Sequence, residues 1–451
     1  MSAQTDLLRD SVAGKQALAT LVEKVLDEAR SQGVSAAEAD VSVGQGLSVT
    51  VRLGEVETVE HNRDKNLGLT VFFGHKSASA STSDFSAAAI RDTVRAACSI
   101  AKYTAADECA GLADLKQLAK DPPDLDLHHP WKLSAEVATA MARECEDAAR
   151  GVDRRIKNSE GATVSSYDGL EVYGNTNGFL GAIPASRQSL SCSVIAQDDA
   201  GMQRDYWYSV ARDASDLQTP EQVGTIAGHR ALRRLGARQP GTRETPVVYE
   251  APVASTLLSH FVGAVRGSSL YRQASFLLDH VGKQVFSDWV RIVEQPHLPK
   301  AMGSTPFDDE GVATREHDLV AGGTLKRYVL DSYSARKLGL QTTGNAGGVH
   351  NLTIEPGERD LPALLKYMET GLLITELIGF GVNIVTGDYS RGATGFWIEK
   401  GEIQYPVEEI TVAGNLKSIF TDIQAVGNDV DTRGNIRSGS ILVASMTVAG
   451  N

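Results

Sequence analysis

The order of apolar and polar residues divides the first part of the chain into segments with two different periods. Residues 5–31 repeat apolar side chains at helical spacing and predict an amphipathic helix. Residues 39–81 change to a period of two, in short runs that glycines such as Gly44 and the polar stretch 62–66 separate, which predicts an antiparallel meander with turns at those points. A second helix is predicted over residues 84–102, which makes a helix, sheet, helix unit.

The middle of the chain resumes this order after a proline-containing linker at residues 121–124. One helix is predicted over residues 134–150 and another over residues 220–235, with alternating segments between them. The strands predicted there cover residues 162–172, 178–183, 189–196 and 202–210.

From Pro246 onwards the chain consists mainly of turn-rich, glycine-dense β segments. Helices, predicted over residues 252–266 and 360–372, are a minority there. We therefore predict an α+β protein, with N-terminal units of helices and antiparallel sheet followed by a mostly antiparallel β C-terminal domain with inserted helices. The predicted domains are residues 1–118, 119–240 and 241–451.

Acidic residues exceed basic ones, 57 to 44, so the chain carries a net charge of −13. Such a charge repels phosphate backbones and anionic lipid surfaces, so neither nucleic acid nor a membrane is expected as a partner. The most apolar stretch, residues 371–385, is interrupted by polar residues and is shorter than the roughly 20 residues that a spanning helix needs.

The sequence also favours the cytoplasm. Its N-terminal residues lack the basic start and apolar stretch of a secretory signal. Its four cysteines form no C-x-x-C pair, and such a distribution is typical of reduced thiols in a cytosolic protein rather than of a zinc ribbon or a redox couple.

A zinc hydrolase needs paired histidine ligands and a glutamate base, and none of the ten histidines occurs in that pattern. The helix predicted over residues 252–266 carries one lone histidine, His260. A phosphate-binding glycine loop is absent from the sequence as well.

The segment 387–392 places Ser390 between glycines, but not at the G-x-S-x-G spacing of a nucleophile elbow. The pattern favours a tight turn in which Asp388 accepts backbone hydrogen bonds and Arg391 pairs locally, with nucleophilic chemistry at Ser390 as the alternative. A different signal is the set of β segments near Tyr389, which could accept an extended peptide by strand addition. The candidate peptide-binding residues are Asp388, Tyr389, Ser390 and Arg391.

Several long stretches carry a resemblance to a known family. They are DLQTPEQVG (216–224), SFLLDHVGKQVFSDW (275–289), TPFDDEGVATR (305–315), LDSYSARKLGLQTTGNAGG (330–348) and GVNIVTGDYSRGATGFWIEKGEIQYPVEEITVAGNL (381–416). Shorter matches, GEVETVE (54–60) and AKYT (101–104), extend the resemblance over nearly the whole chain. The chain resembles the TldD/PmbA family and, within it, the type of subunit called TldE or PmbA.

The resemblance implies a cytosolic, heterodimeric zinc metallopeptidase for unfolded or extended peptides, which matures peptide precursors and degrades an antitoxin. Its TldD-type subunit carries a His-Glu-x-x-x-His helix and a later cysteine as zinc ligands. In this sequence the first histidine falls on Ser259, the glutamate on His260 and the second histidine on Ala264, and the cysteine falls within residues 427–429, which contain none. The resemblance thus implies that zinc belongs to the partner, and that this chain has no cofactor and no catalytic residue.

Two other hypotheses stay open on sequence grounds. The chain could be a free-standing peptide-binding or assembly protein, as a homodimer without peptidase activity. It could also be a hydrolase that uses Ser390. The leading hypothesis is the non-catalytic subunit of a heterodimeric peptidase.

Overall fold

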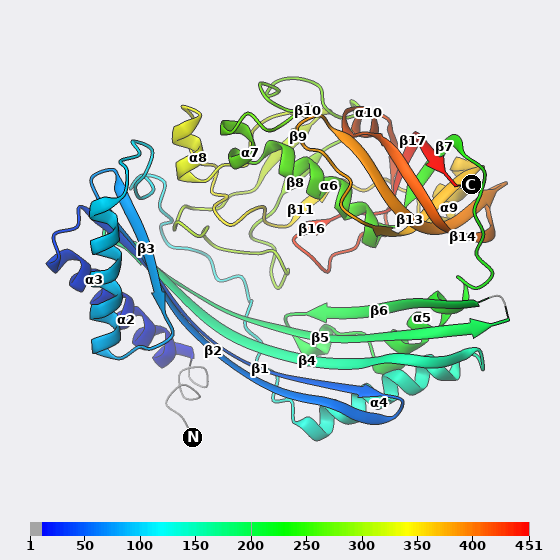
Figure 1. Cartoon of the computed structure of the whole chain (residues 1–451), viewed down its shortest axis with the longest axis horizontal. Coiled ribbons are helices and arrows are strands. Elements are labelled where there is room, and N and C mark those ends of the chain that lie inside the picture. Colours follow the sequence, from blue (N-terminus) through cyan, green and yellow to red (C-terminus); the bar gives the residue numbers. More distant parts are fainter. Residues whose placement is uncertain (1–10, 200, 451) are drawn as a thin grey trace.

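A long, strongly curved antiparallel sheet spans one side of the molecule, and a second, β-rich body lies on its concave side (Figure 1). The computed structural model describes residues 11–199 and 201–450. The curved sheet has the strand order β3-β2-β1-β4-β5-β6. Its strands are β1 (Ala36–Arg52), β2 (Glu55–Phe73), β3 (Lys76–Thr82), β4 (Ile156–Asn175), β5 (Leu180–Asp198) and β6 (Gly201–Ala211).

The pairing of β1 with β4 joins the first two parts of the chain in one sheet. The two strands stay in register from the pair Glu38 and Asn175 to the pair Val51 and Ala162. Residues 1–118 and 119–240, which the sequence divides into two domains, therefore contribute strands to the same sheet.

The turns predicted at Gly44 and at residues 62–66 are wrong, because both lie inside long strands. Gly44 lets the Tyr167 side chain lie across β1, since a Cβ atom at Gly44 would be 2.2 Å from the Tyr167 hydroxyl oxygen. Residues 62–66 belong to a part of β2 that is exposed throughout and that β3 does not reach, since β3 pairs only from Leu67 onwards. No core contact imposes an apolar alternation there, so the segment resembles a turn in sequence.

The strands predicted over 178–183 and 189–196 are one continuous strand, β5. Pro184 separates them in the sequence, but it lies where β5 pairs with β4 alone, because β6 begins to pair only at Gln188. A proline is tolerated at such a free edge, where its missing N–H is not required.

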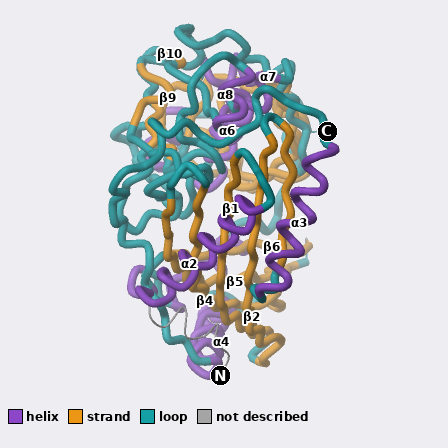
Figure 2. The backbone as a smooth tube through the Cα atoms, turned by 90° about the vertical axis from the view of Figure 1, so that its left-hand side faces the viewer, coloured by secondary structure: helices purple, strands orange, loops and turns teal. Residues whose placement is uncertain are grey.

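Helices cover the convex side of the sheet in two separate groups (Figures 1 and 2). One group is α2 (Ser11–Ser31) and α3 (Ala87–Tyr103), and the other is α4 (Ala135–Gly151) and α5 (Pro220–Leu232). Each group packs on its own hydrophobic cluster. Residues 5–10 of the first predicted helix lie outside the described residues. Helix α3 begins later than predicted because Ser86 caps it, accepting a hydrogen bond from the Ala89 N–H.

Helices α4 and α5 pack so closely that only glycine fits at Gly224. A Cβ atom there would lie 2.0 Å from the carbonyl oxygen of Cys145 and 3.0 Å from the amide nitrogen of Ala149. Since backbone atoms cannot move aside cheaply, we expect Gly224→Ala to lower the free energy of unfolding by about 1–3 kcal/mol, as measured by urea denaturation. Gly151→Ala is the matched control, because a Cβ atom at Gly151 meets nothing within 4 Å. Equal losses in both variants would contradict this account.

The β-rich body contains a barrel. Strands are paired in the order β14-β13-β12-β7-β17-β15, and an additional pairing of β14 with β17 closes the first five into the barrel. Only β7 and β12 run parallel within it. The strands are β7 (Arg243–Tyr249), β12 (Gly371–Ile378), β13 (Asp388–Glu399), β14 (Glu402–Asn415), β15 (Ile423–Val426) and β17 (Ile441–Ala449).

A smaller sheet and short helices complete this body. The sheet, in the order β10-β9-β8-β11-β16, consists of β8 (Ile292–Glu294), β9 (His317–Ala321), β10 (Thr324–Leu325), β11 (Leu352–Ile354) and β16 (Ile436–Arg437). The helices are α6 (Ala251–Val265), α7 (Gly267–Tyr271), α8 (Ser332–Lys337), α9 (Leu361–Met368) and α10 (Leu416–Thr421), and a single 3-10 turn, η1 (Ala214–Asp216), follows β6. The mostly antiparallel architecture with inserted helices confirms the predicted α+β class.

Neither a disulfide nor a membrane-crossing helix is found in the described residues. Cys98, Cys145 and Cys192 are buried free thiols, and Cys109 is a half-buried one. None of the helices within residues 11–199 and 201–450 combines the length and the apolar character that crossing a bilayer requires.

Candidate functional site

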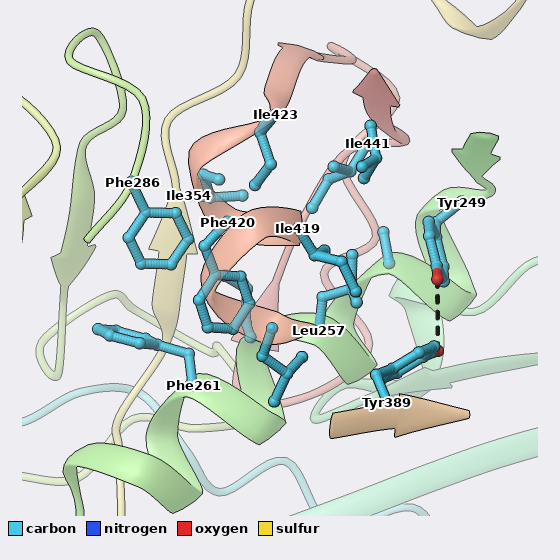
Figure 3. Close-up of a cluster of buried hydrophobic side chains, with 14 of the residues drawn as sticks. Tyr249, Leu257, Phe261, Phe286, Ile354, Tyr389, Ile419, Phe420, Ile423 and Ile441 are labelled. Atoms are coloured by element: carbon cyan, nitrogen blue, oxygen red, sulfur yellow. Dashed lines mark hydrogen bonds between the residues drawn. The ribbon is translucent and has the colours of Figure 1, made fainter. Parts of the chain in front are cut away.

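Helix α6 is positioned by a large apolar cluster between the barrel and the smaller sheet. Its apolar residues recur at helical spacing, so that Leu257 and Phe261 point into the cluster, where Phe261 meets Phe286 and Phe420 (Figure 3). The residues between them, Ser259 and His260, lie outside that buried face. The packing of one side of α6 therefore determines which side chains its other side presents.

The two positions that correspond to the histidines of the metal-binding motif hold no zinc ligand. Ser259 is exposed and its hydroxyl donates to the Ser255 carbonyl oxygen over 3.1 Å, whereas Ala264 is fully buried.

The position that corresponds to the cysteine ligand lies at the other end of α6. The carboxylate of Asp429 accepts hydrogen bonds from the amide and hydroxyl of Ser440, and the Ser440 hydroxyl oxygen accepts one from the N–H of Ala251. His260 is nine residues beyond Ala251, or about 13 Å along the helix axis. The structure therefore does not bring residues 427–429 and His260 together.

His260 is a neutral imidazole at neutral pH. Its ring packs edge-on against Tyr389, with ring centroids 5.9 Å apart, and its Nε2 atom finds no hydrogen-bond partner among the described residues. Burial lowers the pKa of His260 to about 4, and the positive charge of Arg391 contributes in the same direction.

Strand β13 divides the four candidate peptide-binding residues between two faces. Tyr389 is buried and Arg391 half-buried on the side towards α6, whereas Asp388 and Ser390 are exposed. This alternation separates Ser390 from His260, so the two do not form a nucleophile and base pair. The same alternation places Arg391 on the face near His260, although the two residues are more than a hundred positions apart in the sequence.

The local hydrogen bonds predicted for this segment are wrong. Asp388 accepts from side chains, namely the Thr386 hydroxyl at 2.6 Å and the Asn415 amide at 3.2 Å, and these bonds lower the pKa of its carboxyl. Arg391 has no local partner either. Its Nε atom is buried without a hydrogen bond, and the described part of the chain provides no ion pair for it.

The backbone of Asp388–Arg391 is occupied on both sides. Strand β14 pairs with it on one side. On the other side the preceding loop folds back, since the Asn383 N–H donates to the Asp388 carbonyl oxygen and the Ser390 N–H donates to the Gly381 carbonyl oxygen. Residues 381–386 form this loop. A ligand therefore reaches this segment through side chains and not by strand addition.

Exposed apolar side chains lie in and next to this loop. Ile378, which pairs with Gly392, is 56% exposed, Val385 is 53% exposed and Phe380 is 100% exposed. The sequence analysis missed Phe380, and its position between two glycines is the signal that could have revealed it.

Tyr249 is a second residue of the site that the sequence did not reveal. Its hydroxyl donates to the Tyr389 hydroxyl oxygen over 3.4 Å, and both rings are buried (Figure 3). This contact joins β7 to β13, so no sequence pattern marks it. It holds Tyr389 against the ring of His260.

The residues present here do not fit a zinc ion. Zinc is held by three or four His, Cys, Asp or Glu ligands. In residues 11–199 and 201–450 no group of three or more such side chains is placed to hold a metal ion. The unpaired positive charge of Arg391 next to His260 also opposes a second cation.

Comparison with known proteins identifies relatives over nearly the whole chain. Profiles of the PmbA/TldA metallopeptidase family match in three parts: domain 1 at residues 37–101, the central domain at residues 128–235 and the C-terminal domain at residues 242–450. The metalloprotease PmbA of Escherichia coli is 50% identical over 95% of this chain and 96% of its own length. The PmbA homologue of Haemophilus influenzae is 48% identical over 97% of both chains.

Solved structures share the whole fold. A proposed modulator of DNA gyrase from Bacteroides thetaiotaomicron superposes with a TM-score of 0.91 at 29% identity, over 96% of this chain and 98% of its own. TldE from Thermococcus kodakarensis superposes with a TM-score of 0.85, over 95% of this chain and 100% of its own, and at 19% identity it supports the fold alone.

Proposed function

This chain belongs to the PmbA/TldA metallopeptidase family, and from that premise we propose that it is the non-catalytic subunit of a heterodimeric zinc peptidase. Its partner would be a TldD-type subunit that holds the zinc ion. The complex would work in the cytoplasm on unfolded or extended peptides.

One observation carries the proposal, namely that the motif positions on α6 no longer hold zinc ligands. An exposed Ser259 and a buried Ala264 offer no ligand, and the imidazole of His260 stands next to the guanidinium of Arg391. The relatives are named metalloproteases, which fits either a chain that holds the metal or a chain that works beside one that does. The surroundings of His260 favour the second.

A similar chain is the natural partner in this proposal. A TldD homologue from Haemophilus influenzae is 26% identical over 66% of this chain, so the two kinds of chain share much of their sequence pattern. A pair of related chains can divide the work, because one can keep the fold and the surfaces that receive a peptide while the other performs the hydrolysis.

The test measures zinc content and cleavage of an unfolded protein, casein, for this chain alone, for a TldD-type partner alone and for the two mixed. We expect zinc to follow the partner and cleavage to occur only in the mixture. Ser259→Ala in this chain is a useful control, because the zinc content of the mixture should then stay unchanged.

Other outcomes would overturn the proposal. Stoichiometric zinc and casein cleavage in this chain alone would mean that another site carries the chemistry. An inactive mixture, together with a homodimer of this chain that binds peptides, would support the free-standing binding protein instead.

A further inference from the structure

The convex face of the curved sheet is apolar towards both ends and polar in the middle. On β4, Val164 belongs to the apolar cluster under α4 and α5, and Leu170 belongs to the cluster under α2 and α3. The alternation of the strand brings the two side chains between them, Ser166 and Asp168, to the same face. Both are 8% exposed. Aspartate is rarely buried to this extent unless it is paired, so the burial of Asp168 needs a reason.

Asp168 is a carboxylate for which the described residues provide no partner. Its Oδ1 atom is buried and accepts no hydrogen bond. Asp205 and Glu294 also have a buried oxygen without a hydrogen bond, but each has an ion-pair partner. Arg230 lies 3.3 Å from the Asp205 carboxylate, and His317 lies 3.0 Å from that of Glu294. For Asp168 burial acts alone and raises the pKa of the carboxyl to about 6, so its charge calls for a cation from outside the chain.

Asp168 lines a cavity of about 160 Å³ between the sheet and the segment that leads into α4. That segment contributes Trp131 and Leu133 to the lining, and β2 contributes His61 and Arg63. The part of β2 that carries these two residues is exposed throughout, so the cavity is reached from solvent there. A water molecule needs roughly 10–15 Å³ of such space, and the cavity therefore admits a chain of several heavy atoms.

These features together select an aliphatic ammonium group as the occupant. The lone carboxylate requires a positive charge. A metal ion would need further ligands, and in residues 11–199 and 201–450 no group of three or more His, Cys, Asp or Glu side chains is placed to hold one. Trp131 and Leu133 offer apolar surface to a hydrocarbon stem, and the indole ring also attracts a cation. A lysine side chain combines a compact ammonium group with such a stem.

We propose that the cavity beside Asp168 is a binding site for an aliphatic ammonium group, such as the side chain of a lysine in another polypeptide carries. The ammonium group pairs with the Asp168 carboxylate, and the hydrocarbon stem lies against Trp131 and Leu133. The site is on the convex side of the sheet, whereas the body that contains α6 lies on the concave side (Figure 1). The inference therefore goes beyond the proposed function and does not depend on it.

The experiment measures fluorescence anisotropy of two short peptides with the full chain alone at pH 8. The peptides carry the label on their N-terminal amine and differ only in the central residue, which is lysine in one and norleucine in the other. We expect the lysine peptide to bind about 10- to 100-fold more tightly, as a charge-assisted hydrogen bond implies. Displacement of the lysine peptide by 1,5-diaminopentane would identify free diamines as a second source of the ammonium group.

Variants separate this site from general attraction, because the net charge of −13 draws any cation towards the chain. Asp168→Asn should abolish the preference for lysine over norleucine. Asp92→Asn is the matched control, since Asp92 forms an exposed ion pair with Arg95 on α3 and lies outside the cavity. It removes the same charge and should keep the full preference.

The preference for lysine should fall as the pH is lowered from 8 to 5. A carboxyl that is protonated below its pKa of about 6 no longer attracts an ammonium group. His61 also lines the cavity, and a protonated imidazole would oppose binding as well. Arg63 is the other titratable side chain of the lining, and arginine stays protonated over this whole range. His61→Gln should therefore retain the fall with pH, and Asp168→Asn should remove it.

Three results would overturn the inference. The first is equal binding of the two peptides by the unchanged chain. The second is an undiminished preference in Asp168→Asn, with circular dichroism showing that this variant is folded. The third concerns stability without a ligand at pH 8, where Asp168→Asn should raise the melting temperature because a buried charge without a counter-ion is lost. A lower melting temperature would mean that a group of the chain itself, such as Arg63, neutralises Asp168.

Discussion

Replacing Glu250 with alanine is expected to lower the free energy of unfolding by about 3–5 kcal/mol. Glu250 is 8% exposed, and its carboxylate accepts from Arg230 at 3.1 Å and from Arg233 at 3.3 Å. Both arginines lie at or next to the end of α5. Removing the carboxylate would leave Arg233 without its ion-pair partner and Arg230 with Asp205 alone, next to each other in a half-buried site, which is costlier than losing an exposed ion pair.

The effect should be large because Glu250 belongs to a network that joins the two bodies. Arg230 also reaches Asp205 on β6 over 3.3 Å, and Arg234 lies 2.6 Å from Glu376 on β12. The arginines come from the body with the curved sheet, whereas Glu250 directly precedes α6 and Glu376 belongs to the barrel. The network therefore holds the beginning of α6 against the curved sheet.

The measurement is urea denaturation followed by near-ultraviolet circular dichroism. Glu57→Ala is the matched control, since Glu57 forms an exposed pair with Arg52 at 3.4 Å and such pairs contribute at most about 1 kcal/mol. Replacing Glu250 with leucine and Arg230 with methionine together should recover part of the loss, because both charges then leave. If Glu250→Ala costs no more than Glu57→Ala, the network does not hold the junction.

Phe420→Ala is expected to destabilise the β-rich body by about 3–5 kcal/mol. Phe420 on α10 is 1% exposed, and its ring stacks on Phe286 with centroids 4.7 Å apart and meets Phe261 edge-on at 5.9 Å (Figure 3). The substitution would empty the centre of this cluster, and surrounding β strands limit how far the cavity can close.

Two further variants serve as controls for Phe420→Ala. Phe420→Leu retains most of the volume and should lose less than half as much stability. Ile403→Ala removes an apolar side chain that is 48% exposed on β14, and it should change the free energy of unfolding by no more than about 0.5 kcal/mol. A Phe420→Ala variant as stable as Ile403→Ala would mean that the cluster does not support the barrel.

Local patterns in the sequence predict much of the fold because they depend on near neighbours. The helix predicted over 134–150 is observed as Ala135–Gly151, capped by Ser134, whose hydroxyl oxygen accepts a hydrogen bond from the Val137 N–H. The helix predicted over 252–266 is observed as Ala251–Val265. In both helices the spacing of the apolar residues predicts which face is buried, and this spacing can be read within one short segment of the sequence.

The same reasoning fails where a distant residue changes the meaning of a local signal. In the sequence Gly44 indicates a turn, but in the structure it lies within a strand, where the Tyr167 side chain from β4 packs over it. Residues 62–66 look like a turn because the exposed edge of β2 requires no alternation. Sequence spacing alone cannot reveal either neighbour.

What the sequence by itself determines about this protein is its class, its local elements and the absence of metal ligands at Ser259 and Ala264. Each of these depends on residue types at known positions along the chain. The tertiary structure alone decides that Arg391 meets His260, that Ser390 faces away from it and that a backbone edge is not available at Asp388–Arg391. These relations arise where β13 packs against α6 and pairs with its neighbours, so they depend on contacts between residues far apart in the chain and not on any local pattern.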